Sequence, residues 1–197
     1  MKYILKFIFI ILVSHVYGQS NIEWSGVYKL KLSDFMSPST QVGNVNIYSL
    51  HTGSTFDFVY SMSSYEFMFT KNFNDKVNCY FSRHSASLIA PDSTFAIDLI
   101  NFAQFAFDLS ELYARKFRKE LFENKGAFSN SDFFHEYYNE IQGEYVERYS
   151  NASITTDLGR NHEKLSELQK KVLDEIQELS EYCKTCKPKK RKKNASP

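Results

Sequence analysis

The chain has 197 residues, of which 43% are hydrophobic and 24% are charged, and its formal net charge is +1. These values are ordinary for globular proteins, so they exclude a collagen-like, low-complexity or wholly disordered chain. Its 18 Phe, 13 Tyr and single Trp supply ample apolar surface for a core. Three cysteines are too few for a disulfide-stapled scaffold, so the core must hold a single domain together.

The N-terminus predicts export. Lys2 and Lys6 flank the start of an apolar run at 7–13, and small residues follow up to Gly18. This order is typical of a secretory signal peptide, which we place at 1–18. The apolar run is far shorter than the roughly 20 residues needed to span a bilayer. We therefore expect a secreted or periplasmic protein with no transmembrane span after cleavage of the signal.

The next segments predict a small sheet. Apolar and polar residues alternate in five short stretches, separated by turn-forming residues: 27–32, 46–50, 56–60, 65–69 and 77–81. Alternation with a period of two indicates strands with one buried face. We expect an antiparallel β-meander of about five strands.

From residue 92 onward the apolar spacing becomes helical. Three helices are predicted, at about 93–124, 131–149 and 161–179. Residues suited to cap them precede each helix: Asp92 or Ser93, Asn130 or Ser131, and Asn161. Strands followed by helices predict an α+β fold, with the helices packed on the sheet in one domain at 19–183.

The C-terminal segment 184–197, called here the basic tail, carries seven Lys and Arg residues. Residues 19–183 carry 15 basic and 23 acidic residues, a net charge of −8. In a cytosolic protein such a tail would indicate a nuclear signal or a nucleic-acid partner, but the predicted signal peptide argues against both. Two interpretations remain: a disordered, solvated terminus, or a contact with an anionic envelope surface.

Two cysteines, Cys183 and Cys186, form a C-x-x-C at the end of the third predicted helix. Redox motifs of this kind normally begin a helix, where the helix N-terminus lowers the thiol pKa. We expect a local disulfide or free thiols, with metal binding and redox catalysis as less favoured alternatives. Cys79 lies in an apolar strand and is expected to be a core residue.

No catalytic constellation is evident from spacing. The four histidines after the signal are scattered along the chain: His51, His84, His135 and His162. The sequence His135-Glu136-Tyr137-Tyr138-Asn139 misses the zinc-helix pattern H-E-x-x-H because its last residue is asparagine. A G-x-S-x-G elbow and a Gly-rich phosphate loop are both missing from the sequence.

Three segments together suggest a family. Phe107–Arg118 resembles a helix of a bacterial family of uncharacterised, predicted secreted zinc-dependent proteases, common in Bacteroidetes, which reads roughly H-E-Q-G-H-F-D-x-x-E-x-x-A-R-x-x-R. Leu30–Phe35 is similar to the family's early L-x-W-x-D-F, and Tyr149–Lys164 to its late Y-x-x-x-T-x-H-G-x-N-x-E-K. The similarity spans about 24–180. The family positions retained here are Asp34, Phe35, Asp108, Glu111, Arg115, Arg118 and Gly159.

The chain differs from this family at the positions that would bind the metal and activate water. Where the family has H-E-Q-G-H, this chain has Phe102-Ala103-Gln104-Phe105-Ala106, and the late histidine is Leu158. The early tryptophan is Leu32. The resemblance therefore implies a zincin-like remnant without metal ligands or a water-activating glutamate. Because Phe102 and Ala106 lie on the apolar stripe of their helix, we expect packed side chains where relatives hold an ion.

Three functional hypotheses follow. The leading one is an exported, catalytically inactive relative of these proteases, without a cofactor, that acts as a binding or structural protein of the envelope for an unknown partner. The alternative is an active metalloprotease that recruits His51, His84, His135 or His162 together with Glu111. A third is an adhesion module that contacts an anionic surface through the basic tail.

Overall fold

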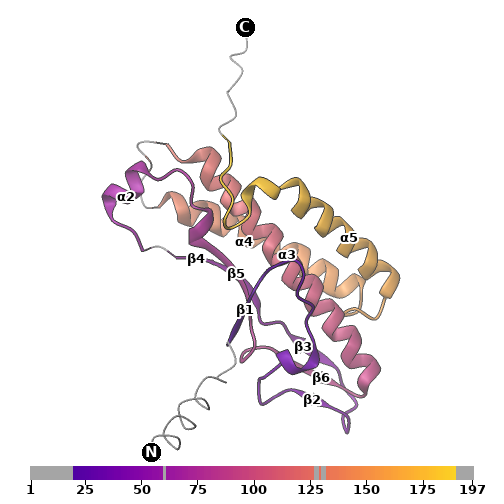
Figure 1. Ribbon diagram of the computed structural model, residues 1–197. Helices are drawn as coiled ribbons and strands as arrows, with labels where there is room; N and C mark the ends of the chain where they lie inside the picture. Colours follow the sequence, from indigo (N-terminus) through magenta and orange to yellow (C-terminus); the bar gives the residue numbers. More distant parts are fainter. Residues whose placement is uncertain (1–19, 60, 127–128, 130–131, 190–197) are drawn as a thin grey trace, which may run out of the picture.

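The computed structural model describes residues 20–59, 61–126, 129 and 132–189 (Figure 1). The predicted signal peptide and residues 190–197 of the basic tail lie outside these residues. Within the described ranges, no helix has the length and apolar character needed to cross a membrane.

The strands form two small sheets. One is antiparallel, with the order β1-β5-β4, and consists of Asn21–Glu23, Val77–Ser82 and Ser54–Phe58. The other has the order β2-β6-β3 and consists of Gln41–Val42, Ser87–Ala90 and Ser49–His51. In this second sheet β2 runs parallel to β6, whereas β3 is antiparallel to it. Alternate residues of β5 are buried, so one face of the first sheet is dry.

Four α-helices are described: α2 (Ser64–Phe69), α3 (Ser93–Asn124), α4 (Phe133–Thr155) and α5 (His162–Glu178). Three short 3₁₀ turns complete the order: η1 (Leu32–Asp34), η2 (Asn74–Lys76) and η3 (Ser180–Tyr182). The caps expected for α3 and α5 are present, whereas the N-cap of α4 is Asp132, which makes no side-chain cap hydrogen bond, and the predicted caps Asn130 and Ser131 lie outside the described residues. The Asp92 carboxylate accepts hydrogen bonds from the amides of Thr94 and Phe95, and the Asn161 side chain accepts one from the Lys164 amide.

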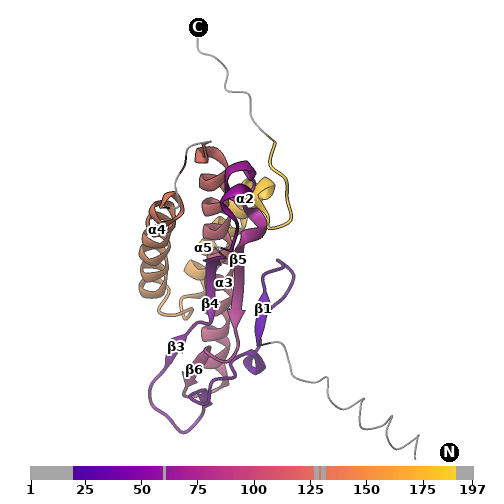
Figure 2. The same ribbon diagram turned by 90° about the vertical axis from the view of Figure 1, so that its left-hand side faces the viewer.

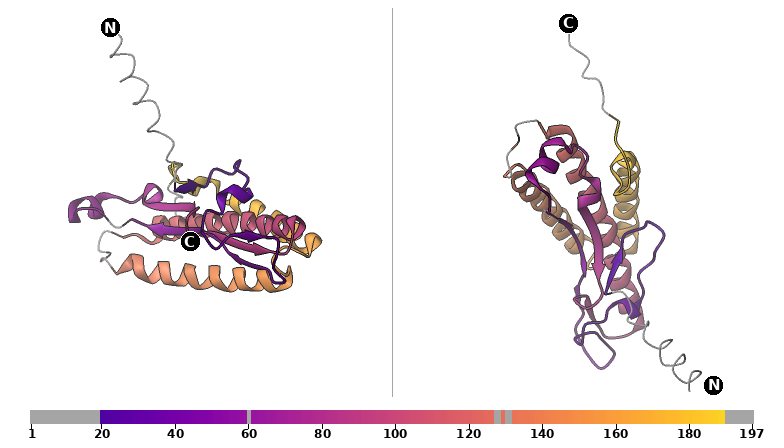
Figure 3. Two further views of the ribbon diagram at one scale, coloured as in Figure 1. Left: turned by 90° about the horizontal axis from the view of Figure 1, so that it is seen from below. Right: turned by 60° about the vertical axis from the view of Figure 1, so that its left-hand side comes forward.

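Helix α3 is the centre of the molecule. It contacts α4 and α5 as well as β4, β5 and β6 (Figure 2; Figure 3). Its residues are buried on every side from Phe105 to Ala114, as expected of a helix enclosed by other elements. Aromatic rings join the layers, since the Phe56 ring of β4 packs edge-on against the rings of Tyr138 and Tyr145 on α4.

The α+β class and the order of strands followed by three long helices are confirmed. The strand assignments differ in detail from the expected single meander. Residues 27–32 form no strand, because the Asp34 carboxylate accepts hydrogen bonds from the Lys31 amide and the Tyr28 hydroxyl and closes a tight turn. Residues 65–69 belong to a helix, α2, because the Ser63 hydroxyl caps it by accepting a hydrogen bond from the Glu66 amide at 3.1 Å.

Candidate functional site

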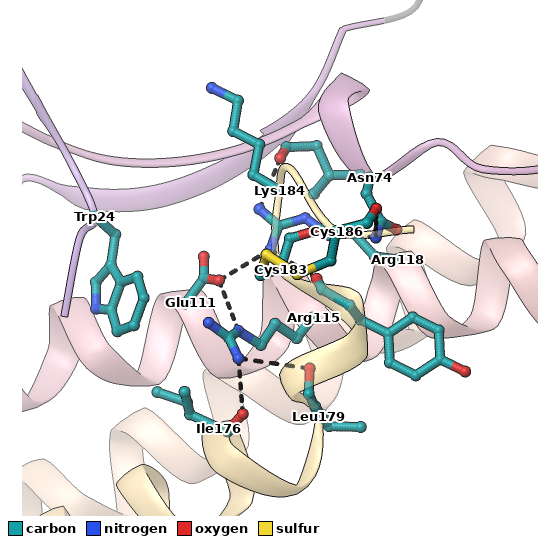
Figure 4. A network of polar contacts seen from close by, with 12 residues as sticks. Trp24, Asn74, Glu111, Arg115, Arg118, Ile176, Leu179, Cys183, Lys184 and Cys186 are labelled. Carbon is teal, nitrogen blue, oxygen red and sulfur yellow. Dashed lines mark hydrogen bonds and ion pairs between the residues drawn. A yellow bond between two sulfur atoms is a disulfide. The ribbon is translucent and has the colours of Figure 1, made fainter. Parts of the chain in front are cut away.

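Four of the seven residues shared with the family that the sequence resembles lie on one side of α3, and Figure 4 shows Glu111, Arg115 and Arg118 there. Asp108, Glu111, Arg115 and Arg118 follow one another at intervals of three and four residues, which places their side chains along one stripe of the helix. All four are buried. Charged residues are rarely buried unless they are paired, so each one requires a partner.

Glu111 pairs with both arginines. Its Oε1 atom accepts hydrogen bonds from Arg115 Nε at 2.8 Å and from Arg118 Nη1 at 2.9 Å. We call Glu111, Arg115 and Arg118 the polar clamp. Two guanidinium groups thus balance the charge of this carboxylate in the interior.

The polar clamp binds backbone from three other elements. Arg115 Nη1 donates to the carbonyl of Ile176 at 2.8 Å, at the end of α5. Arg118 Nη1 donates to the carbonyl of Tyr182 at 3.2 Å, and its Nη2 donates to that of Val77 at 2.8 Å. The cluster thus ties α3 to β5, α5 and η3. This pattern is typical of a structural brace.

A disulfide joins Cys183 to Cys186 and closes a short loop beside the polar clamp (Figure 4). The Asn74 side-chain amide donates to the carbonyls of both cysteines, each at 3.1 Å. The Lys184 ammonium forms an ion pair with Glu23 of β1. The first residues of the basic tail therefore pack on the body of the protein.

A cavity of about 270 Å³ lies between this loop and the polar clamp. Its lining includes Trp24 and Cys79 as well as the three clamp residues. The Trp24 indole nitrogen donates to Asp108 at 2.7 Å, and its ring lies 5.4 Å from the Arg115 guanidinium. Burial, and then the charge of Glu111, raises the pKa of the Cys79 thiol well above its usual range. The cavity therefore offers no reactive thiolate.

The early motif residues lie elsewhere. The Asp34 carboxylate accepts hydrogen bonds from the Tyr28 hydroxyl and the Lys31 amide, each at 3.0 Å, and lies 3.4 Å from Arg83 Nε. Phe35 is buried edge-on against Phe81. Both residues anchor the N-terminal segment and do not belong to the polar clamp.

The positions aligned with the metal site of the family that the sequence resembles carry hydrocarbon side chains. Phe102, Ala103 and Ala106 have no exposed surface, and the Phe102 ring packs against those of Phe105 and Tyr149. Leu158 is half-buried against the core. None of these four side chains has a nitrogen, oxygen or sulfur atom that could coordinate zinc. The residues present here do not fit a zinc ion.

The late motif lies against this part of α3. Gly159 has a φ of 100°, and a Cβ at this position would collide with the carbonyl oxygen of Asp98 and lie 3.2 Å from Phe102 Cβ. Only glycine allows this close approach in that conformation. The retained Gly159 thus has a packing role next to position 102.

The candidate histidine ligands remain dispersed. His51, His84 and His135 are exposed in β3, in the turn after β5 and in α4. His162 Nε2 lies 2.7 Å from Asp98 Oδ1, a contact that their spacing in the sequence did not predict. Among the residues that the structure describes, no group of three or more His, Cys, Asp or Glu side chains is arranged to hold a metal ion.

Sequence reasoning missed the parts of the site outside α3. Trp24 is the only tryptophan, and its indole N–H needs a partner when buried, which was an available signal. Asn74 gave no comparable signal, because its partners are backbone carbonyls more than 100 residues away.

Comparison of the chain with protein-family models, curated proteins and solved structures finds no match. The resemblance to the predicted zinc proteases therefore depends on the motif residues alone.

Proposed function

We propose that this protein is an exported, non-catalytic relative of the predicted secreted zinc-dependent proteases and that it acts as a binding or structural protein of the cell envelope. The observation that carries the proposal is the complete burial of Phe102, Ala103 and Ala106. Relatives would have two metal ligands and the water-activating glutamate at these positions. Here the same positions form interior packing.

The energetics favour this replacement. Burying a Phe side chain contributes roughly 2–3 kcal/mol of transfer free energy. An imidazole buried at position 102 without its metal would instead cost about 1–3 kcal/mol. A chain that no longer needs the ion is therefore stabilised by apolar residues at these sites.

Long-range contacts support the resemblance. The Leu30 amide of the early motif donates to Gln104 Oε1 on α3 at 2.9 Å, and Gly159 of the late motif packs beside Phe102.

The backbone at position 158 also supports the resemblance. Leu158 has a left-handed backbone with φ of 52°. Histidine adopts this conformation more readily than most residues, which fits a position that carries histidine in the family.

Two features support export. The disulfide between Cys183 and Cys186 suits an oxidising compartment. The N-terminal sequence up to Gly18 has the order of a signal peptide. Expression of the whole chain in a bacterium, followed by fractionation, tests this part: the mature protein is expected outside the cytoplasm with Gln19 as its first residue. Recovery of a full-length chain from the cytoplasm would contradict it.

The lack of catalysis is tested on the mature chain purified from zinc-supplemented cells. Elemental analysis is expected to find far less than one zinc per chain, and a peptide library is expected to remain uncut. Stoichiometric zinc with chelator-sensitive cleavage would overturn the proposal. His162→Ala, a change at an exposed ligand candidate, serves as the matched variant, since loss of such cleavage in it would support a recruited metal site.

A further inference from the structure

Helix α2 protrudes from one end of the molecule (Figure 1; Figure 2). Tyr65, Met68 and Phe69, called here the apolar tip, are 74%, 58% and 68% exposed. Their spacing places them on one face of α2. The opposite face is anchored, because the Phe67 ring packs against those of Phe73 and Phe134. The packing of Phe67 thus fixes α2, and with it the apolar tip, on the body of the protein.

Single exposed apolar residues are common, but a cluster of three large ones marks an interaction surface. The Tyr65 and Phe69 rings lie 4.6 Å apart and form a continuous patch. The patch lies on a protrusion and not in a groove. It is therefore suited to insertion into a soft surface, and less suited to receiving a partner's side chains.

Two lysines lie near the apolar tip, of which Lys71 is half-buried and Lys125 is buried. The Lys125 ammonium lies 4.2 Å from the centre of the Phe67 ring, and the Lys71 ammonium lies 5.7 Å from that of Phe122. Burial, and then the charge of Lys71, lowers the pKa of Lys125. The one acidic residue of α2, Glu66, is paired with Lys76 at 3.3 Å.

The basic tail leaves the body at the same place. The Asn72 side-chain amide, just after α2, donates to the Cys186 carbonyl at 3.0 Å. Lys187 and Lys189 follow and are exposed, and the sequence continues with four consecutive basic residues at 190–193. Apolar and basic elements that are far apart in the chain therefore share one end of the molecule.

We propose that this end of the molecule docks on an anionic lipid bilayer, with the apolar tip inserted among the headgroups and the exposed Lys187 and Lys189 on their charges. Stable attachment of a peripheral protein needs two such signals, because either one alone binds weakly and reversibly. Charge also sets the orientation. Residues 19–183 carry a net charge of −8, so an anionic surface repels the body and attracts the basic tail. The proposal goes beyond the proposed function and does not depend on whether the protein is catalytic.

The test uses the mature chain, 19–197, sedimented with vesicles of phosphatidylcholine alone or mixed with phosphatidylglycerol. We expect binding to the anionic vesicles that weakens as salt rises, and little binding to the neutral ones. A variant with Tyr65→Ser, Met68→Ser and Phe69→Ser is expected to bind about tenfold more weakly or worse. Replacing the Lys and Arg residues at 187–193 with Gln is expected to remove the salt dependence.

Ile154→Ser is the matched control. Ile154 is 78% exposed and lies at the other end of α4 from Phe134, the residue that contacts α2. The Ile154→Ser variant should bind vesicles like the wild type. Circular dichroism of each variant verifies the fold. Equal binding by the tip variant, or no preference for anionic vesicles, would overturn the proposal. So would a dimer in solution that the tip variant dissociates, because a second copy would then cover the apolar tip. Zinc analysis of the same preparation reports separately on catalysis.

Discussion

Inside the protein, one oxygen of Glu111 accepts hydrogen bonds from two guanidinium groups that are themselves buried. Removing such charges from water is expensive, and the cost is offset only where the remaining donors also find partners. Arg115 and Arg118 donate to the carbonyls of Ile176, Tyr182 and Val77, whereas Arg118 Nε is buried without a hydrogen-bond partner. The Ile176 carbonyl belongs to the last turn of α5, where a cation is also favoured by the helix dipole.

The polar clamp predicts a large effect of one substitution. Glu111→Gln would leave two buried guanidinium groups without their counterion, so we expect the free energy of unfolding in urea to fall by about 3–5 kcal/mol. Glu147→Gln, at an exposed position of α4, should change it by no more than about 0.5 kcal/mol. A loss of less than about 1 kcal/mol for Glu111→Gln would show that the ion pairs contribute little.

The cysteines make a second prediction at this scale. Cys79 is buried and its thiol pKa is raised well above the usual range, while Cys183 and Cys186 are disulfide-bonded. The native protein at pH 8 is therefore expected to show no thiol that reacts with Ellman's reagent, and unfolding without reductant is expected to expose one per chain. Three reactive thiols after unfolding would contradict the disulfide, and a reactive native thiol would contradict the burial of Cys79.

At the scale of the elements, the sequence predicted the helices better than the strands. Asp92 and Asn161 cap their helices by accepting hydrogen bonds from amides two or three residues further on. Such local start signals can be recognised in the sequence alone. The alternation at 65–69 was misleading because Ser63 and Glu66, three residues apart, form the start signal of a helix. The extended segment at 27–32 was misassigned because the Lys31 amide bonds to the Asp34 side chain and the Leu30 amide to Gln104, instead of to a neighbouring strand.

The contact between α4 and α5 predicts a pH dependence. Arg148 donates two hydrogen bonds to Glu175, at 2.7 and 2.8 Å, and these lower the Glu175 pKa. A lowered pKa means that the pair stabilises the fold above the unfolded-state value of about 4.3 and that this stabilisation is lost as the pH falls through the lower folded-state value. Both side chains are partly exposed, so the contribution is about 0.5–1 kcal/mol.

Glu175→Gln should therefore lower the melting temperature at pH 7 by a few degrees, and the difference from the wild type should vanish at the acid end of a series from pH 7 to about pH 2.5. Glu178→Gln, one turn away on an exposed position, is the control and should show little difference at any pH. A difference that stays constant across the series would contradict the role assigned to the ion pair.

At the scale of the whole molecule, the sequence predicted which residues of α3 share a face but not what lies opposite them. The spacing of Asp108, Glu111 and Arg115 is a local property of a helix. The partners of Glu111 lie on the same helix, but those that Asp108 and Arg115 find on other elements lie roughly 60 to 85 residues away, and the Ile176 carbonyl among them carries no sequence signal. The charge of the basic tail was visible in the composition, whereas the packing of Lys184 and Cys186 on the body was not.

The account depends on Phe102 being a packed interior residue at the position where the predicted zinc proteases that the sequence resembles would bind an ion. Urea unfolding of Phe102→His with and without added zinc tests this most directly. Because the change removes buried apolar surface and buries an imidazole, the free energy of unfolding is expected to fall by about 3 kcal/mol or more, and zinc should not restore it. An unchanged stability, or one that zinc raises, would mean that position 102 faces an open, polar site.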